Sequence, residues 1–156
     1  PALVVFLVDV AKGVAAVAVA RLLWQTFPAL NPGDQRLWWE LGYALMAVVG
    51  HSKSVWINWQ GGKSVATGLG LLALFAWPVA VGALAMFGVL VATVRIVSVG
   101  SLGACLTALA LAVGLGIPPA YQLYVLLATL YITWCHRANI HRLLQGTEPR
   151  LGQPKT

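Results

Sequence analysis

The chain has 156 residues, of which 60% are hydrophobic and only 9% are charged, and its formal net charge is +6. A mean hydropathy of +0.82 does not suit a soluble domain. Several apolar runs approach the ~20 residues that a membrane-crossing helix needs, and alternation with a period of two is nowhere sustained. We therefore expect one all-α domain, a polytopic integral membrane helix bundle that is surrounded by membrane lipids and binds no nucleic acid.

The residues that commonly bind metals are few and scattered. Cys105 and Cys135 both lie in apolar runs, and neither has a partner at a spacing typical of a metal or redox site. Three histidines and four acidic residues complete the set. We expect no metal site and no other cofactor.

The apolar pattern predicts about six membrane segments, some of them short or broken, followed by a polar, basic tail. A loop rich in proline and glycine at 27–36 separates the first two segments, and 95–101 interrupts the pattern with a charge and two hydroxyls. The short segments either extend into their flanking residues or lie in a locally thinned bilayer. The expected segments are 1–24, 37–50, 64–76, 78–94, 102–115 and 120–135, and the expected tail is 136–156.

Two opposite charges lie within the first segment. Asp9 and Lys12 are three residues apart, so they share one face of a helix and can pair. Charges at this depth are costly unless they face the bundle interior or a polar cavity. They form either a structural ion pair or the wall of a site, and we favour the structural pair.

A short polar stretch, 51–63, ends in Gly61-Gly62-Lys63 directly before the predicted helix at 64–76. Glycines allow the backbone N–H groups to point inward, and a helix start adds a partial positive charge. This pattern favours a phosphate-binding loop, although the nucleotide-binding P-loop spacing is absent. The alternative is a turn at the membrane interface with a lysine that extends to the surface.

Alternation of the segments across the membrane brings most of the cations to one side. The positive-inside rule places that side in the cytoplasm. Arg150 and Lys155 are best explained by contact with anionic lipid headgroups. On the other side lie Arg21 and Arg36. The cations of the basic side are Lys53, Lys63, Arg95, Arg137, Arg142, Arg150 and Lys155.

The tail also carries groups that can take part in chemistry. Helical spacing places His136 and Asn139 on one face, so an imidazole and an amide meet at the membrane surface. Because the Gly-Gly-Lys loop emerges on the same side, we expect a catalytic site there.

Three motifs together resemble a known family. They are HSKSVWINWQGGKSVATG from His51, RIVSVGS from Arg95 and HRANIHRLLQGTEPRLG from His136, with DVAKG upstream from Asp9. In this order they are similar to the bacterial acyl-phosphate:glycerol-3-phosphate acyltransferases of the PlsY type, along nearly the whole chain. The closing motif is specific enough to make chance a poor explanation.

The resemblance implies a multi-pass enzyme of the bacterial inner membrane with its active site on the cytoplasmic side. Its substrates would be acyl phosphate and glycerol 3-phosphate. The acyl group would move to the sn-1 hydroxyl, giving lysophosphatidic acid and phosphate in phospholipid synthesis. The alternative function is a membrane transporter or binding protein for a phosphate-bearing anion.

The resemblance also implies roles for individual residues. Gly61, Gly62 and Lys63 would hold glycerol phosphate, and Ser64 stands where the family usually has glycine, where it tightens the loop or adds a hydroxyl. Ser98 would line the site, His136 and Asn139 would be needed for activity, and Glu148 would be mainly structural. The chemistry of the reaction adds two expectations of its own. Arg95 can help Lys63 to screen the two phosphates, and Asn139 and Ser98 can donate to a developing oxyanion, so we expect catalytic roles for His136, Asn139 and Ser98.

Two further expectations come from comparison with the family pattern. The family's first cytoplasmic loop and one membrane helix would lie before Pro1, so we expect a fragment that is inactive alone. Because no carboxylate is suitably placed, the base is either the departing phosphate, as the resemblance implies, or His136.

Overall fold

The computed structural model describes residues 2–55, 58–59 and 61–153, and Lys155, which we expected to contact lipid headgroups, lies outside them. In these ranges the chain is helical and has no strand. The helices are α1 (Ala2–Thr26), η1 (Pro28–Leu30), η2 (Gly33–Gln35), α2 (Arg36–Ser52), α3 (Val65–Phe75), α4 (Trp77–Val94), α5 (Val97–Gly114), α6 (Pro119–Cys135) and α7 (Arg137–Leu144).

The architecture is that of an integral membrane bundle, as the composition predicts. Among the described residues, three helices are long and apolar enough to cross a membrane, namely α1 from Leu3, α4 and α5. The α3 helix is a shorter apolar helix. Large apolar side chains such as Leu22, Met46 and Leu106 are more than half exposed. Outward-facing apolar surface of this kind is expected where lipid surrounds the protein.

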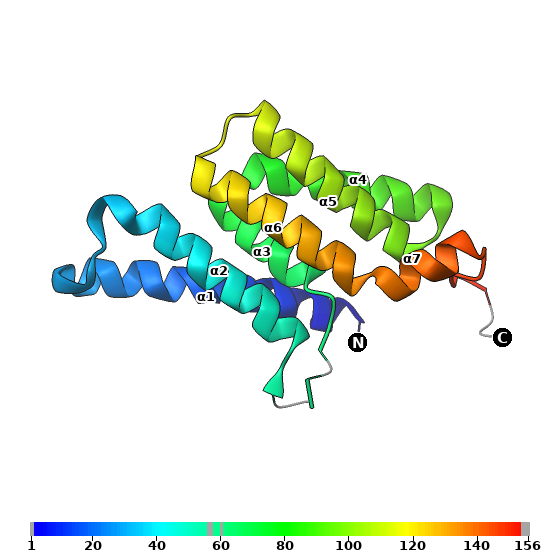
Figure 1. Ribbon diagram of the computed structural model, residues 1–156, viewed down its shortest axis with the longest axis horizontal. Coiled ribbons are helices and arrows are strands. Elements are labelled where there is room, and N and C mark those ends of the chain that lie inside the picture. Colours follow the sequence, from blue (N-terminus) through cyan, green and yellow to red (C-terminus); the bar gives the residue numbers. More distant parts are fainter. Residues whose placement is uncertain (1, 56–57, 60, 154–156) are drawn as a thin grey trace.

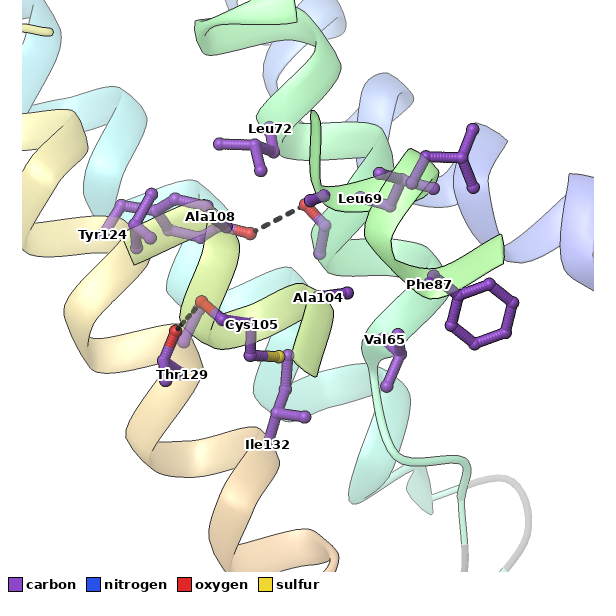
Figure 2. A pocket seen from close by; sticks show the side chains of 15 residues that line it. Val65, Leu69, Leu72, Phe87, Ala104, Cys105, Ala108, Tyr124, Thr129 and Ile132 are labelled. Atoms are coloured by element: carbon purple, nitrogen blue, oxygen red, sulfur yellow. Dashed lines mark hydrogen bonds between the residues drawn. The ribbon is translucent and has the colours of Figure 1, made fainter. Parts of the chain in front are cut away.

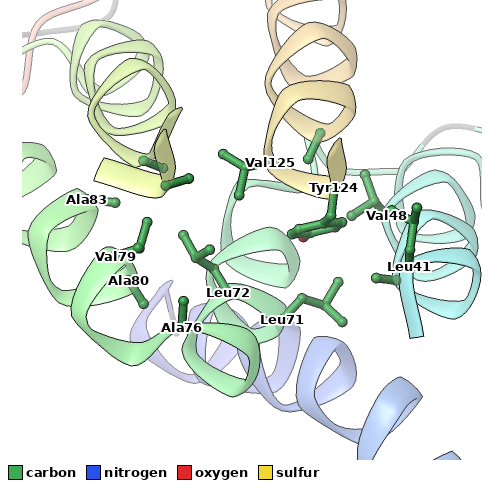
Figure 3. Packing of buried hydrophobic residues seen from close by; sticks show 14 of the residues in the cluster. Leu41, Val48, Leu71, Leu72, Ala76, Val79, Ala80, Ala83, Tyr124 and Val125 are labelled. Carbon is green, nitrogen blue, oxygen red and sulfur yellow. The ribbon is translucent and has the colours of Figure 1, made fainter. Parts of the chain in front are cut away.

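The α3 helix lies inside the bundle and contacts α1, α2, α4 and α6. Figure 1 shows α1 and α2 on one side of it and α4 and α5 on the other. Its Leu71 and Leu72 side chains pack into a core that includes Val48 of α2 and Tyr124 of α6, as Figure 3 shows. The helix that follows the Gly-Gly-Lys loop is therefore fixed from several directions.

Two glycines let the backbones of α1 and α3 touch. A methyl group at Gly13 would lie 2.2 Å from the Thr67 carbonyl oxygen, and one at Gly70 would lie 2.2 Å from the Val10 carbonyl oxygen. No real side chain tolerates such distances to backbone atoms, so glycine is required for this packing. The contact fixes the turn of α1 that carries Asp9 against α3.

The fifth helix begins earlier than the sequence predicts, at Val97 rather than at residue 102. We expected the hydroxyls of 95–101 to interrupt the helix, but each of the two hydroxyls has a hydrogen-bond partner in the structure. Ser101 donates to the Val97 carbonyl at 3.0 Å, and Ser98 donates to Glu148 at 2.6 Å. A serine whose hydroxyl has such a partner is tolerated within a helix.

A buried ion cluster joins three helices at the end of the bundle away from the loop. Arg21 of α1 donates to both carboxylate oxygens of Glu40 at 2.8 and 2.7 Å, and Arg36 donates to Glu40 at 3.0 Å. The Tyr121 hydroxyl donates to the same carboxylate at 2.5 Å. The Glu40 side chain is fully buried. The sequence does not predict this cluster, because only Arg36 and Glu40 have a helical spacing.

Candidate active site

The predicted site residues of the loop and the tail meet at one end of the bundle. The Lys63 ammonium donates to the Asn139 side-chain oxygen at 2.5 Å, although the two residues are 76 positions apart. This contact joins the loop before α3 to α7, the short helix after α6. Our expectation that the two patches face the same side of the membrane required such proximity.

The two loop glycines allow close packing. The φ angle of Gly62 is not positive, so this glycine is not required for a left-handed backbone. A methyl group at Gly61 would lie 2.0 Å from the His51 carbonyl oxygen, and one at Gly62 would lie 2.3 Å from His51 Nε2. The Gly61 N–H donates to the Ser52 carbonyl at 3.0 Å, so this amide is not free for a phosphate.

Ser64 differs from the substrate-binding role that we expected of its hydroxyl. Its side chain is buried, and the hydroxyl donates to the Val48 carbonyl of α2 at 2.6 Å. Its φ angle of 61° is in the left-handed region, which glycine adopts at little cost. The hydrogen bond holds Ser64 against α2 in a backbone conformation that is unfavourable for a residue with a Cβ atom.

His136 lies in the junction between α6 and α7 and is only 2% exposed. Its Nδ1 lies 2.8 Å from the Ile132 carbonyl oxygen, so Nδ1 carries the proton, and the lone pair of Nε2 accepts no hydrogen bond from another described residue. Burial lowers the pKa of His136, the Ile132 hydrogen bond opposes this shift, and the Lys63 charge adds to it. The imidazole is therefore neutral at pH 7 and can accept a proton.

Glu148 is the centre of the polar network. Its carboxylate accepts hydrogen bonds from Asn139 at 2.6 Å, from Ser98 at 2.6 Å and from Arg142 at 2.7 Å. Its side chain is only 5% exposed. The network joins α5, α7 and the residues after α7, and through Asn139 it reaches Lys63. These contacts fit the structural role that the family resemblance implies for Glu148.

The same network predicts how stability depends on pH. Burial raises the pKa of Glu148, but the hydrogen bonds from Asn139, Ser98 and Arg142 outweigh it, and the net pKa is lowered from 4.5. A carboxylate with a lowered folded pKa stabilises the protein above the unfolded pKa and loses this contribution as pH falls through the folded value. The thermal midpoint of Glu148→Gln should therefore lie below that of the wild type at pH 7, and the two should converge below pH 4.5. A difference that persists unchanged in acid would contradict this account.

Lys63 lies in a less polar environment than a surface lysine. Burial lowers its pKa, Glu148 opposes this shift, and the Arg142 charge adds to it. The ammonium is thus less well solvated than in water, which strengthens its attraction to an incoming anion.

Ser98 and Arg95 lie near the network but contribute in different ways. Ser98 is buried, and its only proton points to Glu148, so it is not available to a reaction intermediate in this arrangement. The Arg95 side chain is exposed, and its carbonyl accepts the Leu151 N–H at 2.7 Å. The backbone of the tail thus returns to the turn between α4 and α5. A substrate contact of Arg95 stays a prediction.

A polar pocket of about 290 Å³ opens beside the loop. Its charged side chains are all basic, which suits an anionic ligand. Lys53 and Arg137 lie over the Trp134 ring, 5.7 and 4.5 Å from its centre. The described residues that line the pocket are Ser52, Lys53, Trp59, Gly61, Gly62, Lys63, Trp134, Cys135 and Arg137.

An apolar cavity of about 70 Å³ lies among α3, α4, α5 and α6. Figure 2 shows Val65 and Ile132 at one end of it and Leu72 and Tyr124 farther along the helices. Val65 follows the loop directly, and Ile132 accepts the hydrogen bond of His136. The cavity therefore begins next to the polar network and extends into the apolar bundle.

Asp9 and Lys12 form the ion pair that the sequence predicts, with 3.3 Å between Lys12 Nζ and Asp9 Oδ1. A third group, which the sequence does not predict, lies at this pair: His51 Nδ1 is 3.6 Å from the same Asp9 oxygen. Nothing in the sequence places α1 beside the end of α2. The pair of Arg142 with Glu148 was not predicted either, and its only signal in the sequence is the short separation of six residues.

Comparison with known proteins agrees with the resemblance. A family model described as glycerol-3-phosphate acyltransferase matches residues 1–146. The glycerol-3-phosphate acyltransferases of Acaryochloris marina and Gloeobacter violaceus are each 46% identical to this chain, over 99% of it and 72% of the relative.

Two crystal structures share the fold. Both are of PlsY, described as an integral membrane glycerol 3-phosphate acyltransferase, and both are 28% identical to this chain. The glycerol 3-phosphate form has a TM-score of 0.81, and the matched region covers 96% of this chain and 70% of the PlsY chain. The lysophosphatidic acid form has a TM-score of 0.80. The chain therefore belongs to the glycerol-3-phosphate acyltransferase family and is an integral membrane enzyme of the PlsY type.

Proposed function

We propose that the enzyme transfers a fatty acyl group from acyl phosphate to the sn-1 hydroxyl of glycerol 3-phosphate. The products are lysophosphatidic acid and inorganic phosphate. The observation that carries this proposal is the contact between Lys63 and Asn139, which brings a cationic loop and a buried polar network to the mouth of an apolar cavity. One substrate is a small anion and the other has a long apolar chain, so both kinds of surface are needed.

The basic pocket supports binding of phosphate groups. Lys63 and the cations around Trp134 attract the two substrates and reduce the repulsion between their phosphates. The acyl chain enters from the lipid and lies along the apolar cavity that starts at Val65. Reaction then requires only that the hydroxyl of glycerol 3-phosphate meets the acyl carbonyl between these two regions.

The reaction forms one ester bond and breaks one anhydride bond. The sn-1 oxygen attacks the acyl carbonyl carbon, and the bond from that carbon to the phosphate oxygen breaks. Asn139 keeps one amide proton for Glu148 and can direct the other to the developing oxyanion. The hydroxyl proton goes to the departing phosphate or to His136 Nε2, whose lone pair is free.

The charge distribution supports a cytoplasmic active site in a bacterial inner membrane. The described cations at the end of the bundle that carries the loop are Lys53, Lys63, Arg95, Arg137, Arg142 and Arg150. At the opposite end Arg21 and Arg36 are neutralised in part by Glu40. This asymmetry fits the positive-inside rule. A transporter of phosphate-bearing anions would place its charges near the membrane midplane, so the observed positions favour the acyltransferase.

The test uses membranes that contain the complete protein, rather than residues 1–156 alone, and labelled glycerol 3-phosphate. With acyl phosphate as donor, we expect labelled 1-acyl product and an equal amount of phosphate, both dependent on glycerol 3-phosphate. Product formed only with acyl-CoA would overturn the proposed donor. In the same assay, a His136→Ala enzyme that keeps most of its kcat would exclude His136 as the base and leave the departing phosphate in that role.

A further inference from the structure

His51 lies between α1 and the Gly-Gly-Lys loop, and the mechanism above gives it no task. It is in the last turn of α2, and its side chain is only 15% exposed. The imidazole has a different neighbour at each nitrogen. Nδ1 faces Asp9 of α1 at 3.6 Å, whereas Nε2 faces Gly62 of the loop. The ring therefore fills the space between a fixed helix and the Gly-Gly-Lys loop.

The position of Asp9 is itself well determined. The adjacent Val10 carbonyl packs against Gly70 of α3, and Gly13 packs against the Thr67 carbonyl. Lys12 lies 3.3 Å from the same carboxylate oxygen that faces His51. Because α1 cannot move relative to α3 without breaking these contacts, Asp9 gives the imidazole a stationary neighbour.

The contact with Gly62 has a direct consequence for Lys63. The three atoms nearest to a methyl group at Gly62 all belong to the His51 ring, at 2.3, 3.2 and 3.3 Å. The peptide bond that follows Gly62 leads to Lys63, whose ammonium reaches Asn139. The imidazole thus limits how closely the loop approaches α2, and this distance sets the position of the Lys63 backbone.

We propose that His51, itself oriented by Asp9, is a positioning residue that holds the Gly61–Gly62 backbone where Lys63 can bind the phosphate of glycerol 3-phosphate. The inference rests on the proposed function of the loop. His51 touches neither substrate nor the reacting atoms in this role. Its removal should therefore weaken binding of glycerol 3-phosphate and leave the chemical step largely intact.

The first experiment separates binding from chemistry. In the complete protein, His51→Ala should raise KM for glycerol 3-phosphate about tenfold and change kcat by less than about threefold. Asp9→Asn should raise the same KM by a smaller factor. His141→Ala is the matched control, because His141 is exposed on α7 and contacts Gln145. It should leave both constants unchanged.

The second experiment uses the space that the ring occupies. Gly62→Ala should raise KM for glycerol 3-phosphate because its methyl group displaces the loop from His51. Combining it with His51→Ala removes all three crowding ring atoms, so the double variant should have a KM no higher than His51→Ala alone. Gly61→Ala is the control, since its methyl group would meet backbone atoms of His51 and Ser52, the nearest at 2.0 Å. His51→Ala should not rescue Gly61→Ala.

Thermal unfolding of each variant separates positioning from loss of fold. Should His51→Ala not fold, His51→Asn, which keeps an amide toward Asp9 but withdraws from Gly62, should show the same rise in KM. A normal KM in the folded His51 variant, together with a raised KM in Lys63→Met, would overturn the positioning role and leave the proposed function standing. A normal KM in both variants would instead refute the assignment of the loop to glycerol 3-phosphate.

Discussion

Replacing Lys63 with Met is expected to lower kcat/KM for glycerol 3-phosphate by about 10²–10³-fold. The substitution keeps an unbranched side chain but removes one of the positive charges of the basic pocket, and it leaves the Asn139 oxygen without the Lys63 donor. The lost attraction to the phosphate and the misplaced amide act on the same step, so their effects are not additive. The measurement is the initial rate in membranes at varied glycerol 3-phosphate with a saturating acyl donor.

Arg150→Gln is the matched control for charge. Arg150 is an exposed residue of the tail, and we expected it to contact lipid headgroups. Its neutralisation removes the same unit of positive charge from the same end of the protein, so it should change kcat/KM by less than about twofold. Equal losses in the two variants would mean that general surface charge, and not the placement of Lys63, attracts the substrate.

Replacing Glu40 with Gln is expected to lower the free energy of unfolding by about 3 kcal/mol. The Glu40 side chain is fully buried and accepts hydrogen bonds from Arg21, Arg36 and Tyr121. Gln has the same size but no charge, so Arg21 would remain partly buried without a neutralising partner. The measurement is denaturant unfolding in detergent, with Asp34→Asn as control because Asp34 is an exposed acid in η2.

Activity distinguishes this effect from damage to the site. The Glu40 cluster lies at the start of α2 and of α6, whereas the site lies at the ends of these helices. At a temperature where the variant remains folded, kcat/KM should change by less than about twofold, since distant sites act independently. A large loss of kcat/KM in folded Glu40→Gln would show that the two ends of the bundle are coupled.

Much of the fold was predictable from local patterns. Apolar runs and the prolines and glycines between them predict a helical membrane protein, and spacing alone pairs Asp9 with Lys12. The start of α5 was not predictable in this way. A serine in a sequence can interrupt a helix or lie within it, and the outcome for Ser98 depends on Glu148, which is distant in the chain.

The sequence predicts which residues form the site better than it predicts the hydrogen bonds and packing contacts of those residues. The motifs brought Lys63 and Asn139 together as candidates, and their contact is present. Three details depend on tertiary packing that no motif encodes. The Ser64 hydroxyl bonds to α2, the loop glycines pack against His51, and the Ser98 proton points to Glu148. Each requires knowledge of which helix lies beside the loop.

The contact between Lys63 and Asn139 has a consequence for the resting enzyme. An ammonium group has three protons, and this contact uses one of them. No other described residue accepts a hydrogen bond from this ammonium, so on the proposed assignment two protons remain for the oxygens of an arriving phosphate, and the ligand does not have to displace Asn139. The Lys63 side chain then keeps its position when the ligand enters and leaves, and little reorganisation of the site is required from one turnover to the next.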